Sequence, residues 1–393
     1  MPRDTESIRH PLHERITETT LWGGFRGRDV WNVYPNSFGV PAGRNRGRFA
    51  DKQALLRVQE RYWKKGLPMG MELELELPTQ YDHGGDNYVY MRDYEPVKEV
   101  MELVNKKVID GMRNFALRNG QDWYHWSHTV SAKGDGSLHN GVEFNFQPFT
   151  TNAFKKYAAS TFQDIGYTKF QRMADNAGIH IHIPKAAFSD VELYMWLLLI
   201  QSLNSAKHTN GSTFIETIGQ RGTRTYSHDN DLLTGDRLYN AVINRRWSQG
   251  KYRQINFNGH GNTMEFRIFA SNQMPERLIK NMAFAEHTWR YVHLLMDFVN
   301  DEKYTQALQF LADANMFAGY IRNPNMKGHN DELASFVKRR WKPSSTLMQN
   351  IYGWEFDDTV LPNLVRLNEQ FQNWNNSESI NNNITTNTEE VAQ

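Results

Sequence analysis

Residues 66–77 read GLPMGMELELEL, and this stretch decides the fold expected of the whole chain. Methionine and leucine alternate in it with Glu72, Glu74 and Glu76, and Pro78 follows. Successive side chains of a strand point to opposite faces of a sheet, and proline interrupts strand pairing. The pattern therefore predicts a strand with one apolar face and one face that carries three carboxylates, roughly 6.5 to 7 Å apart.

Other short stretches are also predicted as strands, and they lie near residues 123–130, 142–146, 178–184, 252–258 and 263–269. Glycine-containing turns at 133–137 and 259–262 are expected to join two pairs of them. The polar positions of these strands hold Glu143, Asn145, Gln147, His180, His182, Asn256, Asn258, Glu265 and Arg267. One face of the sheet thus concentrates Glu, His, Asn and Arg, whereas an ordinary solvated face carries Thr, Ser and Lys.

Stretches with helical spacing lie between the strands. Helices are predicted over 95–118 and 152–175, after a capping box at 189–192, and from Pro275 to about residue 300. Sequential strand hairpins mixed with long helices predict an α+β fold. Residues 208–250 are interpreted as a long loop-rich region between two strands of the site, and hence as a candidate lid.

The composition excludes several classes of protein. The chain has 393 residues with 45 Lys and Arg against 44 Asp and Glu, so its near-neutral charge favours neither nucleic acid nor membrane. Without cysteine, any bound metal must be held by Glu, Asp, His or water. No apolar run reaches the roughly 18 residues of a membrane span, and the N-terminus lacks a signal-peptide pattern. A cytoplasmic protein is expected.

Four regions are expected along the chain. Residues 1–65 are interpreted as an irregular basic lead-in, residues 66–300 as the domain that carries the site, and residues 301–372 as a helical region packed on it. Residues 373–393 are rich in Asn, Ser, Thr and Glu and poor in apolar side chains. Such a segment cannot bury enough surface to order itself, so we predict a disordered tail.

The acidic face predicts a cation site. Three glutamates on one strand, with Glu143 and Glu265 on neighbouring strands, would repel one another unless a cation lies between them. Mg²⁺ and Mn²⁺ prefer carboxylate oxygens, and histidine suits Mn²⁺ better than Mg²⁺. The spacing of His180 and His182 places both rings on that same face. An ordinary solvated face is the alternative interpretation.

Arginines follow in the segment between the histidine strand and the Glu265 strand, namely Arg221, Arg224, Arg237, Arg245, Arg246 and Arg253. Guanidinium groups match phosphate oxygens, so phosphate recognition is one interpretation, and a solvated basic loop is the other. The chain has neither a Walker A sequence nor a dinucleotide-binding glycine pattern. A nucleotide would therefore be held by metal ions and arginines.

The ordered motifs resemble those of the amidoligase family, carboxylate–amine ligases related to glutamine synthetase and γ-glutamylcysteine ligase. The similar motifs are Gly70-Met71-Glu72-Leu73-Glu74, Asp135-Gly136-Ser137, Gly141-Val142-Glu143, Gly178-Ile179-His180-Ile181-His182, Tyr252-Arg253-Gln254-Ile255-Asn256 and Thr263-Met264-Glu265-Phe266-Arg267. The resemblance covers roughly residues 66–295. The chain departs from the family after Glu143, where it continues FNFQP instead of a Ser-Pro pair.

The resemblance implies a fold and a set of site residues. The fold would be a curved antiparallel sheet with helices on its convex face and the active site on its concave face. The implied metal ligands are Glu72, Glu74, Glu143, His180 and Glu265. Arg267, Arg253 and His182 would act on phosphate or substrate, and Asn256 would help Arg253 and Arg267 to bind the nucleotide.

The implied reaction uses ATP and Mg²⁺ (or Mn²⁺) to join a carboxylate to an amine through an acyl phosphate. The partners would be small molecules or peptides, with neither nucleic acid nor membrane involved, and the sequence leaves the oligomeric state open. A loop acid such as Asp82 or Asp86 could accept the proton of the amine.

Two other functions remain open. A metal-dependent hydrolase would use His180, His182 and carboxylates to activate water, without requiring ATP. A non-catalytic structural relative would keep the fold without the reaction.

Overall fold

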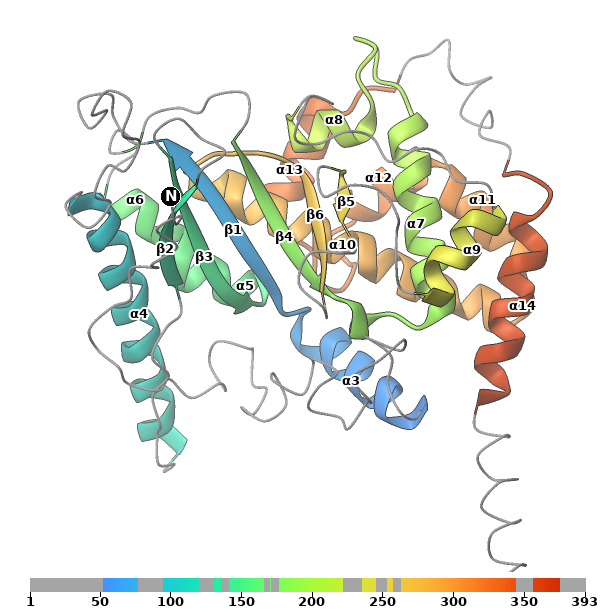
Figure 1. Cartoon of the computed structure of the whole chain (residues 1–393), viewed down its shortest axis with the longest axis horizontal. Helices are drawn as coiled ribbons and strands as arrows, with labels where there is room; N and C mark the ends of the chain where they lie inside the picture. Colours follow the sequence, from blue (N-terminus) through green and yellow to red (C-terminus); the bar gives the residue numbers. More distant parts are fainter. Residues whose placement is uncertain are drawn as a thin grey trace, which may run out of the picture.

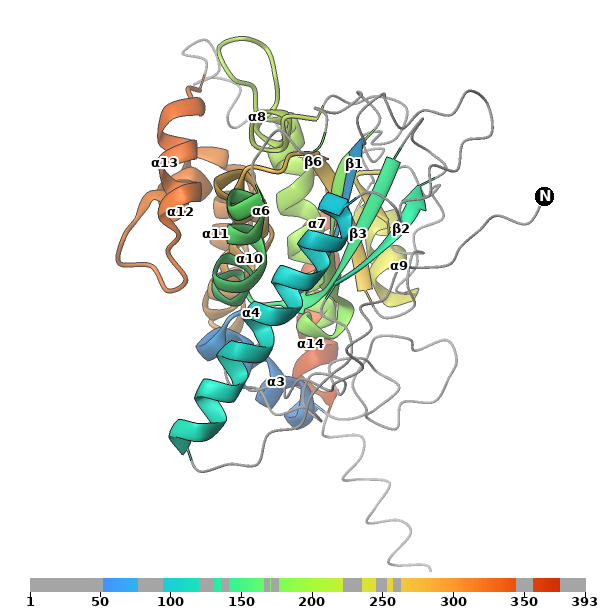
Figure 2. The same ribbon diagram turned by 90° about the vertical axis from the view of Figure 1, so that its left-hand side faces the viewer.

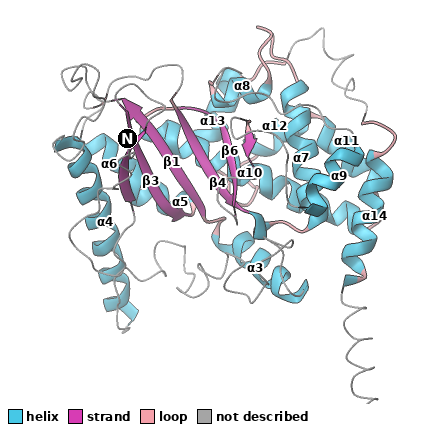
Figure 3. Ribbon diagram, viewed as in Figure 1, coloured by secondary structure: helices cyan, strands magenta, loops and turns pink. Residues whose placement is uncertain are grey.

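The computed structural model describes residues 52–76, 95–119, 130–135, 141–165, 170, 177–221, 235–244, 253–256, 263–343 and 356–374. These residues form an antiparallel sheet and a larger set of helices (Figures 1 and 3). The predicted α+β class is therefore confirmed.

Six strands are found within the described ranges, and all of their pairings are antiparallel. They are β1 (Met69–Glu76), β2 (Val130–Asp135), β3 (Gly141–Phe149), β4 (Gly178–Pro184), β5 (Ile255–Asn256) and β6 (Thr263–Ala270). Their order across the sheet is β2-β3-β1-β4-β6-β5. This order places β4 between β1 and β6, so the strands that carry the predicted site residues are neighbours.

The sheet has one apolar face, as the alternation predicts. Met71, Leu73 and Leu75 of β1 are each at most 1% exposed, and the isoleucines of β4 are fully buried. Helices α4 (Glu95–Asn119), α6 (Ser160–Ile165) and α10 (Pro275–Asn300) lie on one side of the strands in the side view (Figure 2). The opposite face of the central strands carries the glutamates and histidines.

The other helices surround this core. They are α3 (Lys52–Lys65), α5 (Thr151–Phe154), α7 (Asp190–Ser205), α8 (Phe214–Gly219), α9 (Gly235–Asn244), α11 (Tyr304–Ala312), α12 (Ala314–Arg322), α13 (Asp331–Arg340) and α14 (Val360–Gln372). A π-helical turn, Lys155–Ala159, joins α5 to α6, and a 3₁₀ turn, Lys185–Ala187, follows β4. Helices α11 and α14 both pack against α7. No helix in the described ranges is long and apolar enough to span a membrane.

Several elements differ from the sequence prediction. Lys133 and Asp135, predicted as part of a turn, belong to strand β2 and pair with β3, while residues 123–129 of the strand predicted there lie outside the described ranges. The region 208–250 contains α8 and α9 and is therefore not simply a loop, because a capping box at Thr213 and Glu216 starts α8. Residues 136–137 of the first predicted turn and all of the second, 259–262, lie outside the described residues, as do residues 375–393 of the predicted tail.

Helix α3 belongs to the region interpreted as an irregular lead-in, and that interpretation is wrong for residues 52–65. Leu55 and Tyr62 are buried in the core at 2% and 0% exposure. Gln59 Nε2 donates to the carbonyl oxygen of Ala187, just after β4. The helix therefore fixes the chain immediately before β1.

The capping box of α7 is confirmed and yields a stability prediction. The backbone N–H of Glu192 donates to Ser189 Oγ at 3.2 Å, and Ser189 N–H donates to Glu192 Oε2 at 2.8 Å. We expect Ser189→Ala to lower the free energy of unfolding by about 1 kcal/mol, because it leaves a helix N–H without its acceptor. Urea denaturation measures this, with Ser205→Ala at the other end of α7 as the control. Equal losses in the two variants would contradict the capping role.

Candidate metal site

The polar face of the central strands brings together most of the predicted site residues. The Cα partners across the sheet are Glu74 and Glu143, Glu72 and His180, His182 and Glu265, and Glu265 and Asn256. Two glutamates are therefore opposite each other where β1 pairs with β3, and a glutamate is opposite a histidine where β1 pairs with β4. Residues more than 190 positions apart in the sequence become neighbours because β4 connects β1 to β6.

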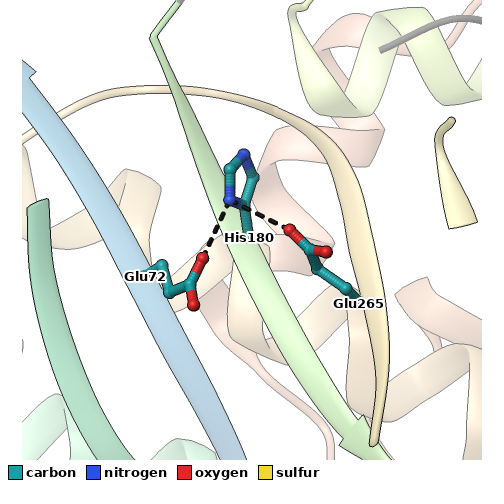
Figure 4. A group of neighbouring side chains, drawn as sticks. All are labelled: Glu72, His180 and Glu265. Carbon is teal, nitrogen blue, oxygen red and sulfur yellow. Dashed lines mark hydrogen bonds and ion pairs between the residues drawn. The ribbon is translucent and has the colours of Figure 1, made fainter. Parts of the chain in front are cut away.

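Glu72, His180 and Glu265 form a compact cluster, hereafter the Glu–His–Glu cluster. His180 Nδ1 lies 3.1 Å from Glu72 Oε2 and 3.2 Å from Glu265 Oε1 (Figure 4). One ligand atom from each of the three residues lies within 4.8 Å of the others, and this is the one such His/Asp/Glu group among the described residues. Two carboxylates and an imidazole are suitable ligands for Mn²⁺. The carboxylate oxygens also suit Mg²⁺, which prefers oxygen ligands.

The charges around this cluster favour a divalent cation. Among the described residues, four carboxylates and two guanidinium groups belong to the cluster or lie beside it, from Glu72, Glu74, Glu143, Glu265, Arg221 and Arg267. Four negative and two positive charges leave an excess of two negative charges when both histidines are neutral. Burial lowers the pKa of His180, although its hydrogen bond to Glu72 opposes this shift. A neutral imidazole is the form that binds a metal ion.

His182 extends the cluster toward the end of β4. Its Nε2 lies 3.1 Å from Glu72 Oε1, and its Nδ1 lies 3.4 Å from the hydroxyl of Thr263. The carboxylate of Glu72 therefore contacts both histidines, one through each oxygen. His182 is placed where it can contact a ligand bound at the cluster.

Glu74 and Glu143 lie beside the cluster, buried at 4% and 7% exposure. Glu74 Oε1 lies 3.6 Å from His180 Nε2, whereas Glu72 and Glu265 approach the opposite ring nitrogen. The backbone N–H of Gly178 donates to Glu74 Oε2. The imidazole of His180 thus stands between Glu74 on one side and Glu72 and Glu265 on the other. That Glu74 and Glu143 ligate a metal stays a prediction.

The departure from the family motif after Glu143 leaves the strand intact. Residues 143–146 pair without interruption with β1, and Val142 and Phe144 are fully buried. Glu143 is therefore held opposite Glu74 on the polar face, even though the sequence after it differs from the family pattern.

Arg267 and Asn256 both contact Glu265. Arg267 Nη1 forms an ion pair with Glu265 Oε1 and lies 3.5 Å from His180 Nδ1. Asn256 Nδ2 donates to Glu265 Oε2 at 2.7 Å. The two oxygens of Glu265 are thus held from two sides. Arg253 is half-buried and lies just before β5. The next residue, Gln254, accepts a hydrogen bond at its backbone carbonyl oxygen from the backbone N–H of Arg267.

Arg221 is a residue of this site that the strand pattern did not single out. It is 8% exposed, and its Nη1 lies 3.5 Å from His180 Nε2 and donates to the carbonyl oxygen of Arg267 at 3.3 Å. Burial lowers its pKa to about 10, and the carboxylates of Glu74 and Glu265 oppose this shift. The sequence contained no period-two signal for it, because Arg221 follows a helix and belongs to no strand.

Other predicted site residues lie outside the described ranges. They include Asp82, Asp86, Arg224, Arg245, Arg246 and Asn258. Arg237 is described, as an exposed residue of α9. Residues 222–234 and 245–250 of the candidate lid also lie outside these ranges, so the candidate general base and the lid stay predictions.

Comparison with known proteins adds one distant similarity. No family model matches the chain, and no curated protein matches it. A solved structure of a GmaS/ADP complex is similar over 91% of this chain and 85% of that chain, with 13% identity and a TM-score of 0.32. This TM-score is too low for a shared fold to follow, so the site is interpreted from its own geometry.

Proposed function

We propose that this protein is an ATP- and Mg²⁺-dependent carboxylate–amine ligase that forms an amide or isopeptide bond. The observation that carries the proposal is the Glu–His–Glu cluster with the guanidinium of Arg267 in direct contact with it. Phosphoryl transfer from ATP needs this combination of a metal site and an adjacent cation. The ordered motifs that resemble the amidoligase family support the same reaction.

The reaction takes place in two steps. The substrate carboxylate attacks the γ-phosphorus of ATP, the bond to the β–γ bridging oxygen breaks, and an acyl phosphate and ADP form. The amine then attacks the acyl carbon, phosphate leaves with the electrons of the acyl C–O bond, and the nitrogen loses a proton. A divalent cation bound at the cluster would offset the negative charge of the phosphate oxygens.

The protein side chains provide charge and position. Arg267 is placed to offset the charge of the transferred phosphoryl group, as arginine does in other phosphoryl transfers. Asn256 fixes the Glu265 carboxylate, so that one oxygen stays directed toward His180. His182 is placed to contact substrate or phosphate beside Glu72. Glu72, His180 and Glu265 would hold this cation, and Glu74 and Glu143 stay candidate ligands of another metal ion beside it.

Ligand-dependent thermal stability tests this function. We expect Mg·ATP to raise the melting temperature when both metal and nucleotide are present, because a ligand at about 100 times its dissociation constant adds about 2.7 kcal/mol of stability. The controls are Mg²⁺ alone, ATP with EDTA, and Mg·ADP. A stabilised protein is then screened for ADP release with mixtures of carboxylic acids and amines.

The outcomes separate the candidate functions. ADP release that requires both an acid and an amine supports the ligase. A melting shift with Mn²⁺ or Mg²⁺ alone, unaffected by ATP, contradicts the ligase and favours a metal-dependent hydrolase. Absence of a shift with every ligand contradicts both enzymes and favours the non-catalytic relative.

A further inference from the structure

Gly178, the first residue of β4, lies directly against the guanidinium group of Arg221. A methyl carbon placed on Gly178 would fall 2.5 Å from Cζ and 2.9 Å from Nη2 of Arg221, and closer still to Nη1. Carbon atoms that are not bonded to these atoms do not approach so closely. The guanidinium of Arg221 therefore occupies the space that a side chain at position 178 would fill.

Gly70 provides a comparison on the neighbouring strand. It lies opposite His182 on the same face of the sheet, and a methyl carbon placed on it would fall 3.4 Å from His182 Cβ. This is an ordinary contact distance. Of these two sheet glycines, Gly178 alone has a side chain closer than ordinary contact distance.

The backbone around Arg221 is held by several contacts. Helix α8 ends at Gln220, which has a left-handed φ of 57° and whose N–H donates to the carbonyl oxygen of Glu216. Lys280 Nζ donates to the carbonyl oxygen of Ile218, and Gln220 bridges to Phe269 of β6. Gly219 is close enough to the backbone of Ile268 that a side chain there would clash. Arg221 therefore extends from a fixed position.

From this position Arg221 reaches the second nitrogen of the His180 ring. Its Nη1 lies 3.5 Å from His180 Nε2, while Glu74 Oε1 lies 3.6 Å from the same nitrogen. The Nδ1 side of the ring contacts Glu72 and Glu265 instead. Glu74 is in turn held by the backbone N–H of Gly178. Glu74 and Arg221 thus lie on the Nε2 side of the His180 ring, and Gly178 contacts both of them.

We infer that Gly178 and Arg221 act as one positioning unit, which orients His180 and Glu74 without ligating the metal. The inference deepens the proposed function and rests on its metal site. Partners that orient a metal-binding histidine through its second ring nitrogen are known to change metal affinity or activity by about 10- to 100-fold. When Nδ1 of His180 binds a metal ion, Nε2 carries the proton and faces Glu74 Oε1 as its acceptor. Arg221 can only donate, so it is a positioning residue that acts on His180 through the Glu74 carboxylate, with which its charge interacts.

The test uses four variants of the full chain: Gly178→Ala, Arg221→Ala, the double variant, and Gly70→Ala as the matched control. The added methyl of Gly178→Ala displaces the end of a flexible side chain, so the backbone can stay in place. Isothermal titration calorimetry measures the dissociation constant for Mn²⁺, and thermal melting confirms that each variant is folded.

We expect each single variant at the unit to bind Mn²⁺ about 10-fold more weakly, or worse, and Gly70→Ala to bind like the wild type. The double variant should bind no more weakly than Arg221→Ala, because the second change finds no guanidinium left to displace. The expected direction is informative, since removal of a positive charge beside a cation site would by itself tighten binding. Unchanged or tighter binding by Arg221→Ala, or losses that multiply in the double variant, would overturn the inference.

A measurement without metal separates this inference from the proposed function. The ring nitrogens of His180 are observed by NMR in protein labelled with ¹⁵N-histidine, and their signals are assigned by their absence in His180→Gln. We expect these signals to shift in Gly178→Ala and Arg221→Ala and to stay in place in Gly70→Ala. If the wild type binds no Mn²⁺ without nucleotide, the NMR shifts alone decide whether the unit orients His180, and the Mg·ATP melting experiment separately decides the proposed function. If the His180 signals do not shift in Gly178→Ala and Arg221→Ala, the inference that these two residues orient His180 is wrong.

Discussion

Glu265→Gln lowers the affinity for Mn²⁺ by more than about 100-fold, beyond the loss typical of residues that only support a ligand. Glu265 contributes one oxygen to the Glu–His–Glu cluster and one to Asn256, and it pairs with Arg267. Glutamine keeps the size of the side chain but removes its charge. The variant leaves Arg267 beside His180 without its carboxylate, so a cation is repelled as well as less well bound. Mn²⁺ titration by calorimetry measures the effect.

The matched control is Glu369→Gln, the same change at an exposed position of α14. This variant should bind Mn²⁺ like the wild type. Both variants should melt as cooperatively as the wild type, because neither changes side-chain volume. Mn²⁺ binding by Glu265→Gln within about threefold of the wild type would refute the assignment of the metal site.

Trp196→Ala is expected to lower the free energy of unfolding by about 3 to 5 kcal/mol, the usual range for removing a large buried aromatic side chain. The ring is fully buried and packs against Phe188 and Phe266, with centroids 5.5 and 5.6 Å away. Its Nε1 donates to Thr288 Oγ1 at 2.9 Å, which ties α7 to α10. The change leaves a cavity in the core, and it removes the N–H that donates to the buried hydroxyl of Thr288. Urea denaturation followed by circular dichroism measures the loss.

The comparison variant is Met316→Ala, which truncates a side chain that is 46% exposed. Its effect should stay within about 0.5 kcal/mol, as for most surface changes. A loss below about 1 kcal/mol in Trp196→Ala would show that the tryptophan does not support the sheet. Because Phe266 lies between Glu265 and Arg267 in β6, the same variant should also weaken Mn²⁺ binding.

The central strands could be predicted from the sequence because their alternation reports burial directly. Leu73 and Ile181 face the helices, and Glu72 and His180 face away from them, as period-two alternation requires. The same signal predicted that Glu72, His180 and Glu265 share a face. Which residues meet there depends on strand order, and the position of β4 between β1 and β6 is a tertiary property.

The remaining features depend on contacts that short sequence patterns do not encode. Arg221 reaches the site from the end of α8, and its place depends on the empty space at Gly178. Register shifts between Ile179 and Ile181, and between Met69 and Met71, alter the pairing in ways that alternation does not reveal. Helix α3 was missed because the basic residues around it suggested a solvated segment, although Leu55 and Tyr62 are buried.

The position of β4 also has a consequence for the order in which the chain is made. Strands β1, β3 and β4 can pair as soon as residue 184 has been synthesised, but the other edge of β4 is covered only by β6, from Thr263 onward. Until then the growing chain presents an unpaired edge of alternating isoleucine and histidine, a surface that invites pairing with other chains. Strand β6 closes this edge and brings Glu265 to Glu72 and His180 in the same step, so the Glu–His–Glu cluster becomes complete only when the aggregation-prone edge disappears.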